Sequence, residues 1–195
     1  MAKLIKLAAL SPKHLNLNGD LGNLLVLKKR LGWRGVNSSI THLKGSEDFS
    51  EFDFILVGHG STAAWTQLLT ETPGLMTGLV KYIKNGGALL AVASAADLLQ
   101  PLLTGVEVIR GEWVSKFVQS EAVVGYLNSA SKSDFLFWIE NSLLTQLHGP
   151  LLAKNPALAD EIISRNDWSD VGVGSPELKE IDQLAIQSRK IAFES

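Results

Sequence analysis

Three short turns in this chain carry residues that could perform hydrolytic chemistry together. Each turn follows an apolar segment typical of a buried strand: Gly58-His59-Gly60, Ala93-Ser94-Ala95 and His148-Gly149-Pro150. A covalent hydrolase needs a nucleophile on a sharp strand-to-helix turn, backbone N–H groups that hold an oxyanion, and a histidine base. The sequence therefore predicts a hydrolase-like constellation, with Gly58 and Gly60 at the oxyanion turn and His148 as the base.

The turn that should hold the nucleophile has none at its centre. Ala93 carries no nucleophilic atom, and the chain contains no cysteine, which excludes thiol catalysis, thiolate metal sites and disulfides. Ser94 has a hydroxyl, but it lies one position further on, without a flanking glycine. Its position is more typical of a helix N-cap, and a role as nucleophile is the weaker alternative.

The other candidate residues also have structural alternatives. His148 could be a structural or relic histidine, and Gly58 and Gly60 could serve only a tight turn. Asp20 and Asn23 flank Gly22, where they could cap the following helix or face a ligand or partner.

Nothing in the sequence predicts a metal or a cofactor. The four histidines are scattered singly, without the spacing of a metal site: His14, His42, His59 and His148. No phosphate-binding loop of the G-x-x-x-x-G-K-[ST] type is present.

The elements that must position these turns alternate along the first half of the chain. Apolar patterns predict strands over 4–10, 36–43, 52–57 and 88–92, and helices over 22–31, 75–84 and 95–103. Further on, 112–127 and 134–139 alternate like antiparallel strands, 143–147 is another apolar run, and helices begin near Pro156 and at Pro176, with Ser175 as the N-cap of the second. This order predicts right-handed βαβ units and a three-layer α/β fold, with a mainly parallel sheet flanked by helices. We expect residues 1–195 to form one domain.

Composition limits the possible functions. The chain is 46% hydrophobic and 19% charged with a formal net charge of -2, which is typical of a globular protein and argues against a nucleic-acid surface. We expect the run Lys28-Lys29-Arg30 to form a solvated helix face. No apolar stretch reaches the roughly 18 to 20 residues of a membrane span, and the first ten residues are too short and too charged for a signal sequence. We therefore expect a soluble, cytoplasmic protein.

Two stretches carry a family resemblance. The segment His14-Leu-Asn-Leu-Asn-Gly-Asp-Leu-Gly-Asn23, followed by Leu27-Lys-Lys-Arg-Leu-Gly-Trp-Arg-Gly35, resembles the N-terminal signature of CobB/CobQ-type class I glutamine amidotransferases. Leu147-His-Gly-Pro-Leu-Leu-Ala-Lys-Asn-Pro-Ala-Leu-Ala-Asp160 is similar to the catalytic-histidine segment of one branch, the glutaminase subunit of lipid II isoglutaminyl synthase. The resemblance extends over about half of the chain and implies a flavodoxin-like fold.

The resemblance places family roles on particular residues. His148 falls on the catalytic histidine, and Gly58 and Gly60 fall in the oxyanion turn. Ala93 falls on the nucleophilic cysteine, with Ser94 and Ala95 where the family has two glycines. In Gly125-Tyr-Leu-Asn-Ser129, Leu127 and Ser129 replace an acidic residue and a histidine, so that only Gly125 and Asn128 remain. A single Cys→Ala exchange could also be engineered, but several departures together favour natural loss.

The resemblance also implies a partner. In this family the glutaminase hydrolyses glutamine and passes ammonia to a Mur-ligase-like, ATP-dependent synthetase, which amidates the D-glutamate of lipid II in peptidoglycan biosynthesis. We therefore expect a degenerate glutaminase-type subunit, inactive towards glutamine and retained for assembly or regulation. The alternatives are a residual hydrolase that uses Ser94 with His148, and a non-catalytic module that binds a small molecule.

Overall fold

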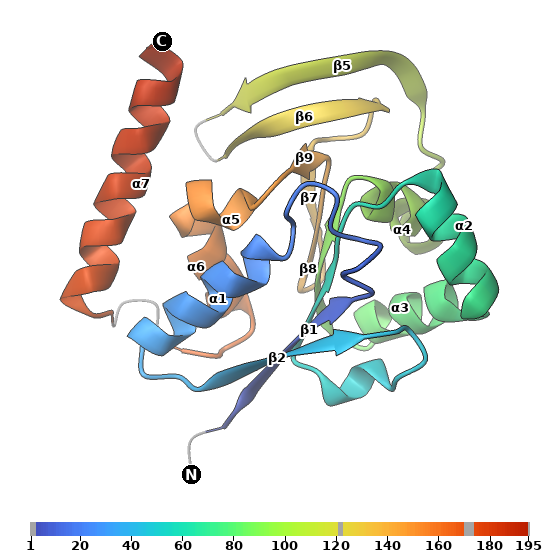
Figure 1. The fold of residues 1–195 in the computed structure, drawn as a ribbon, viewed down its shortest axis with the longest axis horizontal. Helices are drawn as coiled ribbons and strands as arrows, with labels where there is room; N and C mark the ends of the chain where they lie inside the picture. The colour runs from blue at the N-terminus through green and yellow to red at the C-terminus, as the bar shows by residue number, and fades with distance from the viewer. Residues whose placement is uncertain (1–2, 121–122, 170–173, 195) are drawn as a thin grey trace.

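A six-stranded sheet in the order β2-β1-β3-β4-β8-β7 forms the centre of the molecule (Figure 1). The computed structural model describes residues 3–120, 123–169 and 174–194. Five neighbouring strands are parallel, and β7 pairs antiparallel with β8. The strands are β1 (Ile5–Leu10), β2 (Ser38–Leu43), β3 (Phe54–Val57), β4 (Ala88–Val92), β7 (Leu136–Ile139) and β8 (Ser142–Thr145). The predicted mainly parallel sheet is confirmed.

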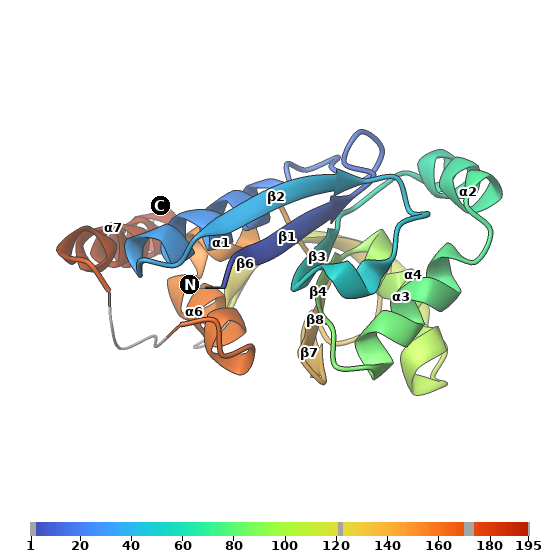
Figure 2. The ribbon, with the colours of Figure 1, turned by 90° about the horizontal axis from the view of Figure 1, so that it is seen from below.

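Helices cover both faces of this sheet and complete the three predicted layers (Figure 2). On one face lie α1 (Gly22–Trp33) and α6 (Pro156–Arg165), and on the other lie α2 (Thr62–Glu71), α3 (Leu75–Lys84) and α4 (Ser94–Thr104). Alternation along β3 shows why both faces need cover, since Phe54 and Leu56 pack in one core and Ile55 and Val57 in the other.

A second, three-stranded sheet stands beyond the carboxyl ends of the parallel strands (Figure 1). Its strands are β5 (Arg110–Gln119), β6 (Val124–Ser131) and β9 (Leu147–His148), all antiparallel. The apolar run predicted over 143–147 is therefore divided at Gln146, with β8 in the central sheet and β9 in the small one. The short helix α5 (Leu151–Lys154) follows β9 directly.

The observed bounds agree with many predictions and add three unpredicted elements. α3 and β4 have the predicted limits, and the last helix, α7 (Pro176–Glu194), begins at Pro176 as expected. The 3-10 helix η1 (Phe49–Glu51), α2 and α5 were not predicted. Within the described ranges, no helix is both long and apolar enough to cross a membrane.

The prediction that Lys28-Lys29-Arg30 is a solvated face is wrong for Arg30. Its side chain is only 3% exposed and contacts Asp160 of α6 and Asp182 of α7 at 2.7 and 2.6 Å. Lys28 and Lys29 are exposed as expected. The helix therefore turns one of its three cations inward, where two carboxylates neutralise it.

Candidate functional site

The turn between β4 and α4 has the geometry of a nucleophile elbow but carries a methyl group at its apex. Ala93 has φ 49° and ψ -107°, an uncommon conformation for a residue other than glycine. Its N–H donates to the carbonyl of Thr145 at 2.7 Å, and its own carbonyl accepts from the N–H of Asp97 at 2.9 Å. The strained strand-to-helix turn is thus held from both sides, although no reactive atom projects from it.

Ser94 does not cap α4. The helix has Ala93 as its N-cap residue, with no side-chain cap, and Ser94 is its first residue, so the N-cap interpretation is wrong. The Ser94 hydroxyl instead points towards the Gly58-His59-Gly60 turn. Its oxygen lies 3.0 Å from the Gly60 N–H, 2.8 Å from the Trp65 Nε1–H and 3.0 Å from His59 Nδ1. The Gly60 N–H and the Trp65 Nε1–H donate to this oxygen and occupy the lone pairs that a nucleophile would use.

The backbone N–H groups that could stabilise an oxyanion are occupied by groups of the chain itself. The Gly60 N–H donates to the Ser94 hydroxyl, and the Ser94 N–H donates to His59 Nδ1 at 3.4 Å. The His59 N–H donates to the Asp20 carboxylate at 2.7 Å. An oxyanion site acts through free donors that await the developing charge. In this arrangement the site is closed by its own side chains.

Gly58 and Gly60 are required here for close packing. A Cβ on Gly58 would lie 2.1 Å from the backbone oxygen of Leu15, and one on Gly60 would lie 2.4 Å from the Leu15 side chain. Neither glycine has a positive φ. The loop that contains Leu15 therefore presses on this turn, and only glycine leaves room for it.

Both ring nitrogens of His148 are engaged. Nε2 lies 3.1 Å from the carbonyl oxygen of Asn128, which can only accept, so Nε2 carries the proton. Nδ1 then accepts from the side-chain amide of Asn18. His148 is thus held in one orientation with a partner at each ring nitrogen, which leaves no free base in this conformation.

His59 and His148 meet beside the elbow. Their ring centroids are 4.8 Å apart with the planes at 86°. Burial, together with the neighbouring His148, lowers the pKa of His59 to about 4, so His59 is neutral at pH 7 and accepts hydrogen bonds through Nδ1. The two histidines are far apart in the sequence, and the fold brings them together. Among the described residues, however, no three His, Cys, Asp or Glu side chains are grouped as a metal site would require.

Asp20 and Asn23 lie inside the molecule. Both are 0% exposed, and α1 has Leu21 as its N-cap without a side-chain cap, so neither side chain caps the helix. Asn23 ties α1 to α5, since its Oδ1 accepts from the N–H of Leu152 at 2.9 Å. Burial raises the pKa of the Asp20 carboxyl. The hydrogen bond from the His59 N–H and the nearby His148 lower this pKa in part.

The segment from Gly125 to Ser129 supports the site from β6. The Asn128 side chain accepts from the Trp113 indole at 2.7 Å, and its backbone carbonyl holds His148. Ser129 is buried and donates to Gln146 at 3.0 Å. Asn128 therefore contacts the candidate base through its main chain, while its side chain is directed to β5.

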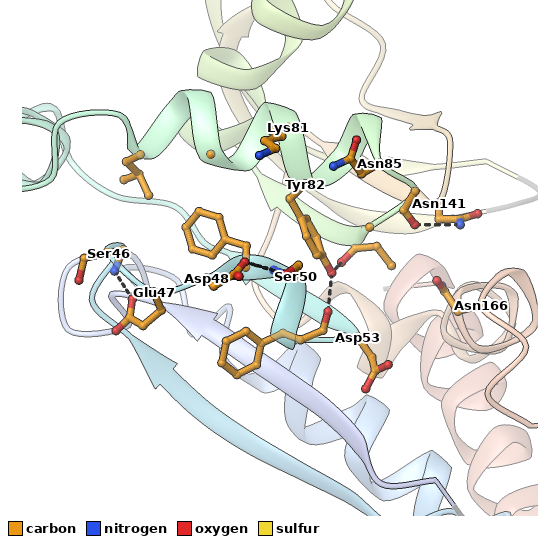
Figure 3. A pocket seen from close by; sticks show the side chains of 18 of the residues that line it. Ser46, Glu47, Asp48, Ser50, Asp53, Lys81, Tyr82, Asn85, Asn141 and Asn166 are labelled. Atoms are coloured by element: carbon orange, nitrogen blue, oxygen red, sulfur yellow. Dashed lines mark hydrogen bonds between the residues drawn. The ribbon is translucent and has the colours of Figure 1, made fainter.

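A groove of about 1030 Å³ lies at the opposite edge of the sheet (Figure 3). It passes the start of β3 at Asp53 and the start of β4 at Ala88, whereas the elbow follows the end of β4. Figure 3 shows the Tyr82 hydroxyl near its centre, bonded to the carbonyls of Phe52 and Ala88 at 3.2 and 3.1 Å. The groove is separate from the residues predicted to do chemistry.

Known proteins share this architecture. No family model matches the chain. It is 24% identical over 224 aligned positions to the lipid II isoglutaminyl synthase (glutamine-hydrolyzing) subunit GatD of Staphylococcus aureus strain N315, covering 92% of this chain and 91% of that protein. Among solved structures, a glutamine amidotransferase matches with a TM-score of 0.51 at 15% identity, over 83% of this chain and 98% of that chain. A Thermotoga maritima glutamine amidotransferase has a TM-score of 0.51 at 11% identity, over 96% and 92%. The fold is that of the class I glutamine amidotransferases.

Within this glutamine amidotransferase fold, sequence reasoning placed the three turns at one edge but missed what links them. His59, Asn18 and Trp65 were not predicted as site residues, although their side chains contact Ser94 or His148. One signal for His59 was available, since it stands between the two glycines of the predicted oxyanion turn.

Proposed function

We propose that this chain is a glutaminase-type subunit that no longer hydrolyses glutamine and is retained to assemble with, or regulate, a synthetase. One observation carries the proposal: the elbow keeps its strained backbone at Ala93 while its apex has no nucleophile. The hydrogen bonds of the neighbouring N–H groups also support it, because the Gly60 N–H donates to the Ser94 hydroxyl and the Ser94 N–H donates to His59.

The partner in this proposal is an ATP-dependent, Mur-ligase-like synthetase of the cytoplasm. The relative in Staphylococcus aureus is a subunit of a lipid II isoglutaminyl synthase, and the similarity to it extends over most of both chains. By this similarity, we assign the chain to the amidation of cell-wall D-glutamate or to a related CobB/CobQ-type reaction.

A residual hydrolase based on Ser94 and His148 has less support. The Ser94 hydroxyl contacts His59, Gly60 and Trp65, while His148 bonds with Asn18 and Asn128. A serine acts as a nucleophile when a base accepts its proton and its lone pair faces the substrate. Among the described residues, the hydrogen-bond partners of His148 are Asn18 and Asn128 and do not include the Ser94 hydroxyl. The lone pairs of that hydroxyl already accept from Gly60 and Trp65.

Reconstitution with the partner tests the proposal. An affinity-tagged chain should copurify from its native cell with a Mur-ligase-like protein, identified by mass spectrometry. The purified complex, given ATP and its carboxylate substrate, should form the amide from free ammonia and not from glutamine. A chain that emerges without any synthetase would count against the assembly role, and amidation from glutamine would count against the loss of chemistry.

A further inference from the structure

Two asparagines of this chain are followed directly by glycine, at Asn18-Gly19 and at Asn85-Gly86. Asparagine is a thermolabile residue, because the backbone nitrogen of the next residue can attack its side-chain amide. A glycine at that next position favours the attack, since it has no Cβ to shield its nitrogen and its backbone turns freely. All four residues are exposed, so exposure alone does not distinguish the two sites.

Backbone hydrogen bonds do distinguish the two sites. At the end of α3, the N–H groups of Gly86 and Gly87 both donate to carbonyls of the helix at 2.9 Å. Gly19 lies in a turn instead, and its N–H donates to the carbonyl of Asn16 at 3.2 Å. A Cβ built on Gly19 meets nothing within 4 Å, so there is room beside this peptide for a ring to close. The Asn18-Gly19 peptide is therefore the less restrained of the two.

The Asn18 side chain lies against the candidate base. Its Nδ2 is hydrogen-bonded to Nδ1 of His148. The loop that contains Asn18 also contacts the predicted oxyanion turn, because the Leu17 N–H donates to the carbonyl of His59 at 3.2 Å. A chemical change at Asn18 therefore reaches the histidine directly and the turn through the loop.

We propose that Asn18 is a site of spontaneous deamidation, which converts the amide beside His148 into a carboxylate. The backbone nitrogen of Gly19 bonds to the side-chain carbonyl carbon of Asn18, and the bond from that carbon to Nδ2 breaks. The proton of the Gly19 N–H leaves on the released ammonia. Water then opens the cyclic imide at either carbonyl, where its hydroxyl stays on the carbon while its other hydrogen returns to the Gly19 nitrogen. The products are aspartate and isoaspartate at position 18, and water is the co-reactant.

The modification changes the contacts of the closed site. A carboxylate is negatively charged and can only accept hydrogen bonds, so it cannot offer His148 the N–H groups of the amide. Isoaspartate also carries the main chain through its side chain, which lengthens the loop between Leu17 and Gly19. The chain thus contains a slow, irreversible change in the partner of its candidate base, and this change needs neither glutamine nor a synthetase.

Peptide mass spectrometry of the full chain, aged at neutral pH and body temperature, tests the proposal. Asn18 should convert about fivefold faster than Asn85, because opening the Asn85-Gly86 peptide breaks one hydrogen bond more. Gly19→Ala should slow the conversion of Asn18 severalfold and leave that of Asn85 unchanged, and circular dichroism checks that the variant is folded. Conversion of Asn18 that is no faster than that of Asn85, or that Gly19→Ala does not slow, would overturn the proposal.

NMR of the histidine rings tests the effect on the site. Asn18→Asp reproduces one of the two products. The His148 ring signals should shift in the aged chain and in Asn18→Asp, whereas those of His42, on the exposed part of β2, should stay in place. Unchanged His148 signals in both samples would overturn the proposed effect. The ammonia comes from Asn18 and not from glutamine, so failure here is distinguishable from failure of the proposed function.

Discussion

Ala93 and Ser94 close the elbow in different ways. Ala93 leaves the apex without a reactive atom, and Ser94 binds the Gly60 N–H and contacts His59 Nδ1. A cysteine at position 93 would therefore still face an occupied oxyanion turn. In the proposed function, the loss of chemistry rests on these two neighbouring residues, so restoring one of them would not be enough.

A pair of variants separates these two contributions. Ala93→Cys alone should hydrolyse glutamine barely or not at all, because the Gly60 N–H remains bonded to Ser94. Ala93→Cys/Ser94→Gly removes that hydroxyl and should be about 100-fold faster, which is the usual value of one oxyanion donor. Ammonia release measures both rates. Equal rates in the two variants would show that Ser94 does not close the turn.

His59 should make the fold sensitive to acid. The unfolded histidine takes up a proton near pH 6.5, whereas burial lowers the pKa of folded His59 to about 4. The unfolded state thus binds the proton first as the pH falls from about 6.5 to about 4, and the free energy of unfolding decreases across that window. With solvent screening, we expect a loss of about 1 to 2 kcal/mol from this residue.

Urea unfolding at pH 7 and pH 4.5 checks this expectation. In His59→Gln the loss between the two pH values should shrink, since glutamine does not titrate. His42→Gln, on the exposed part of β2, is the control and should keep the wild-type loss. An unchanged loss in His59→Gln would contradict the assignment.

At the scale of elements, the turn after β3 is fixed by the loop that packs on it. Gly58→Ala would push a methyl group into the backbone oxygen of Leu15, 2.1 Å away, and backbone cannot move aside as a side chain can. We expect a loss of about 3 kcal/mol in the free energy of unfolding, the upper end of overpacking costs.

Gly32→Ala is the matched control for this prediction. Gly32 lies within α1, and a Cβ there meets nothing within 4 Å. Alanine should stabilise the helix by up to about 1 kcal/mol. Chemical denaturation of both variants gives the comparison, and similar midpoints for the two would refute the close-approach argument.

The sequence predicts elements well where local signals agree. β4 is a run of five buried residues, and Asn85-Gly86-Gly87 ends α3, so the bounds of both elements were predictable. By contrast, a serine at the start of a helix is locally an N-cap, and only the neighbouring strand β3 brings the Gly58-His59-Gly60 turn to Ser94. Its hydrogen-bond partners depend on tertiary packing, which local patterns do not contain.

At the scale of the whole molecule, Arg30 joins three helices that are distant in the sequence. Its contacts, Asp160 and Asp182, lie 130 and 152 residues away, which is why the burial of this cation was not predictable from the run Lys28-Lys29-Arg30. Asp160 also accepts from Arg34 at 2.8 Å. This cluster fastens α7 to α1 and α6.

Arg30→Met should therefore destabilise the fold and release α7. Removing the cation leaves two carboxylates without their main partner, and breaking a buried ion pair costs about 3 kcal/mol or more. Lys3→Met is the control, because the Lys3–Asp53 pair is 71% exposed at the lysine and should contribute less than about 1 kcal/mol. Urea midpoints give the two free energies, and hydrogen exchange shows whether α7 loses protection. Equal effects of the two changes would show that the Arg30 ion pairs do not hold α7 against α1 and α6.

The loss of glutaminase chemistry is the central claim, and release of ammonia from glutamine tests it most directly. The purified wild-type chain, incubated with glutamine labelled with ¹⁵N at its side-chain amide, is followed by NMR for labelled ammonium. The closed elbow predicts no ammonium above the protein-free control. Ammonium release that disappears in Ser94→Ala would contradict the account, because it would show that Ser94 is a working nucleophile.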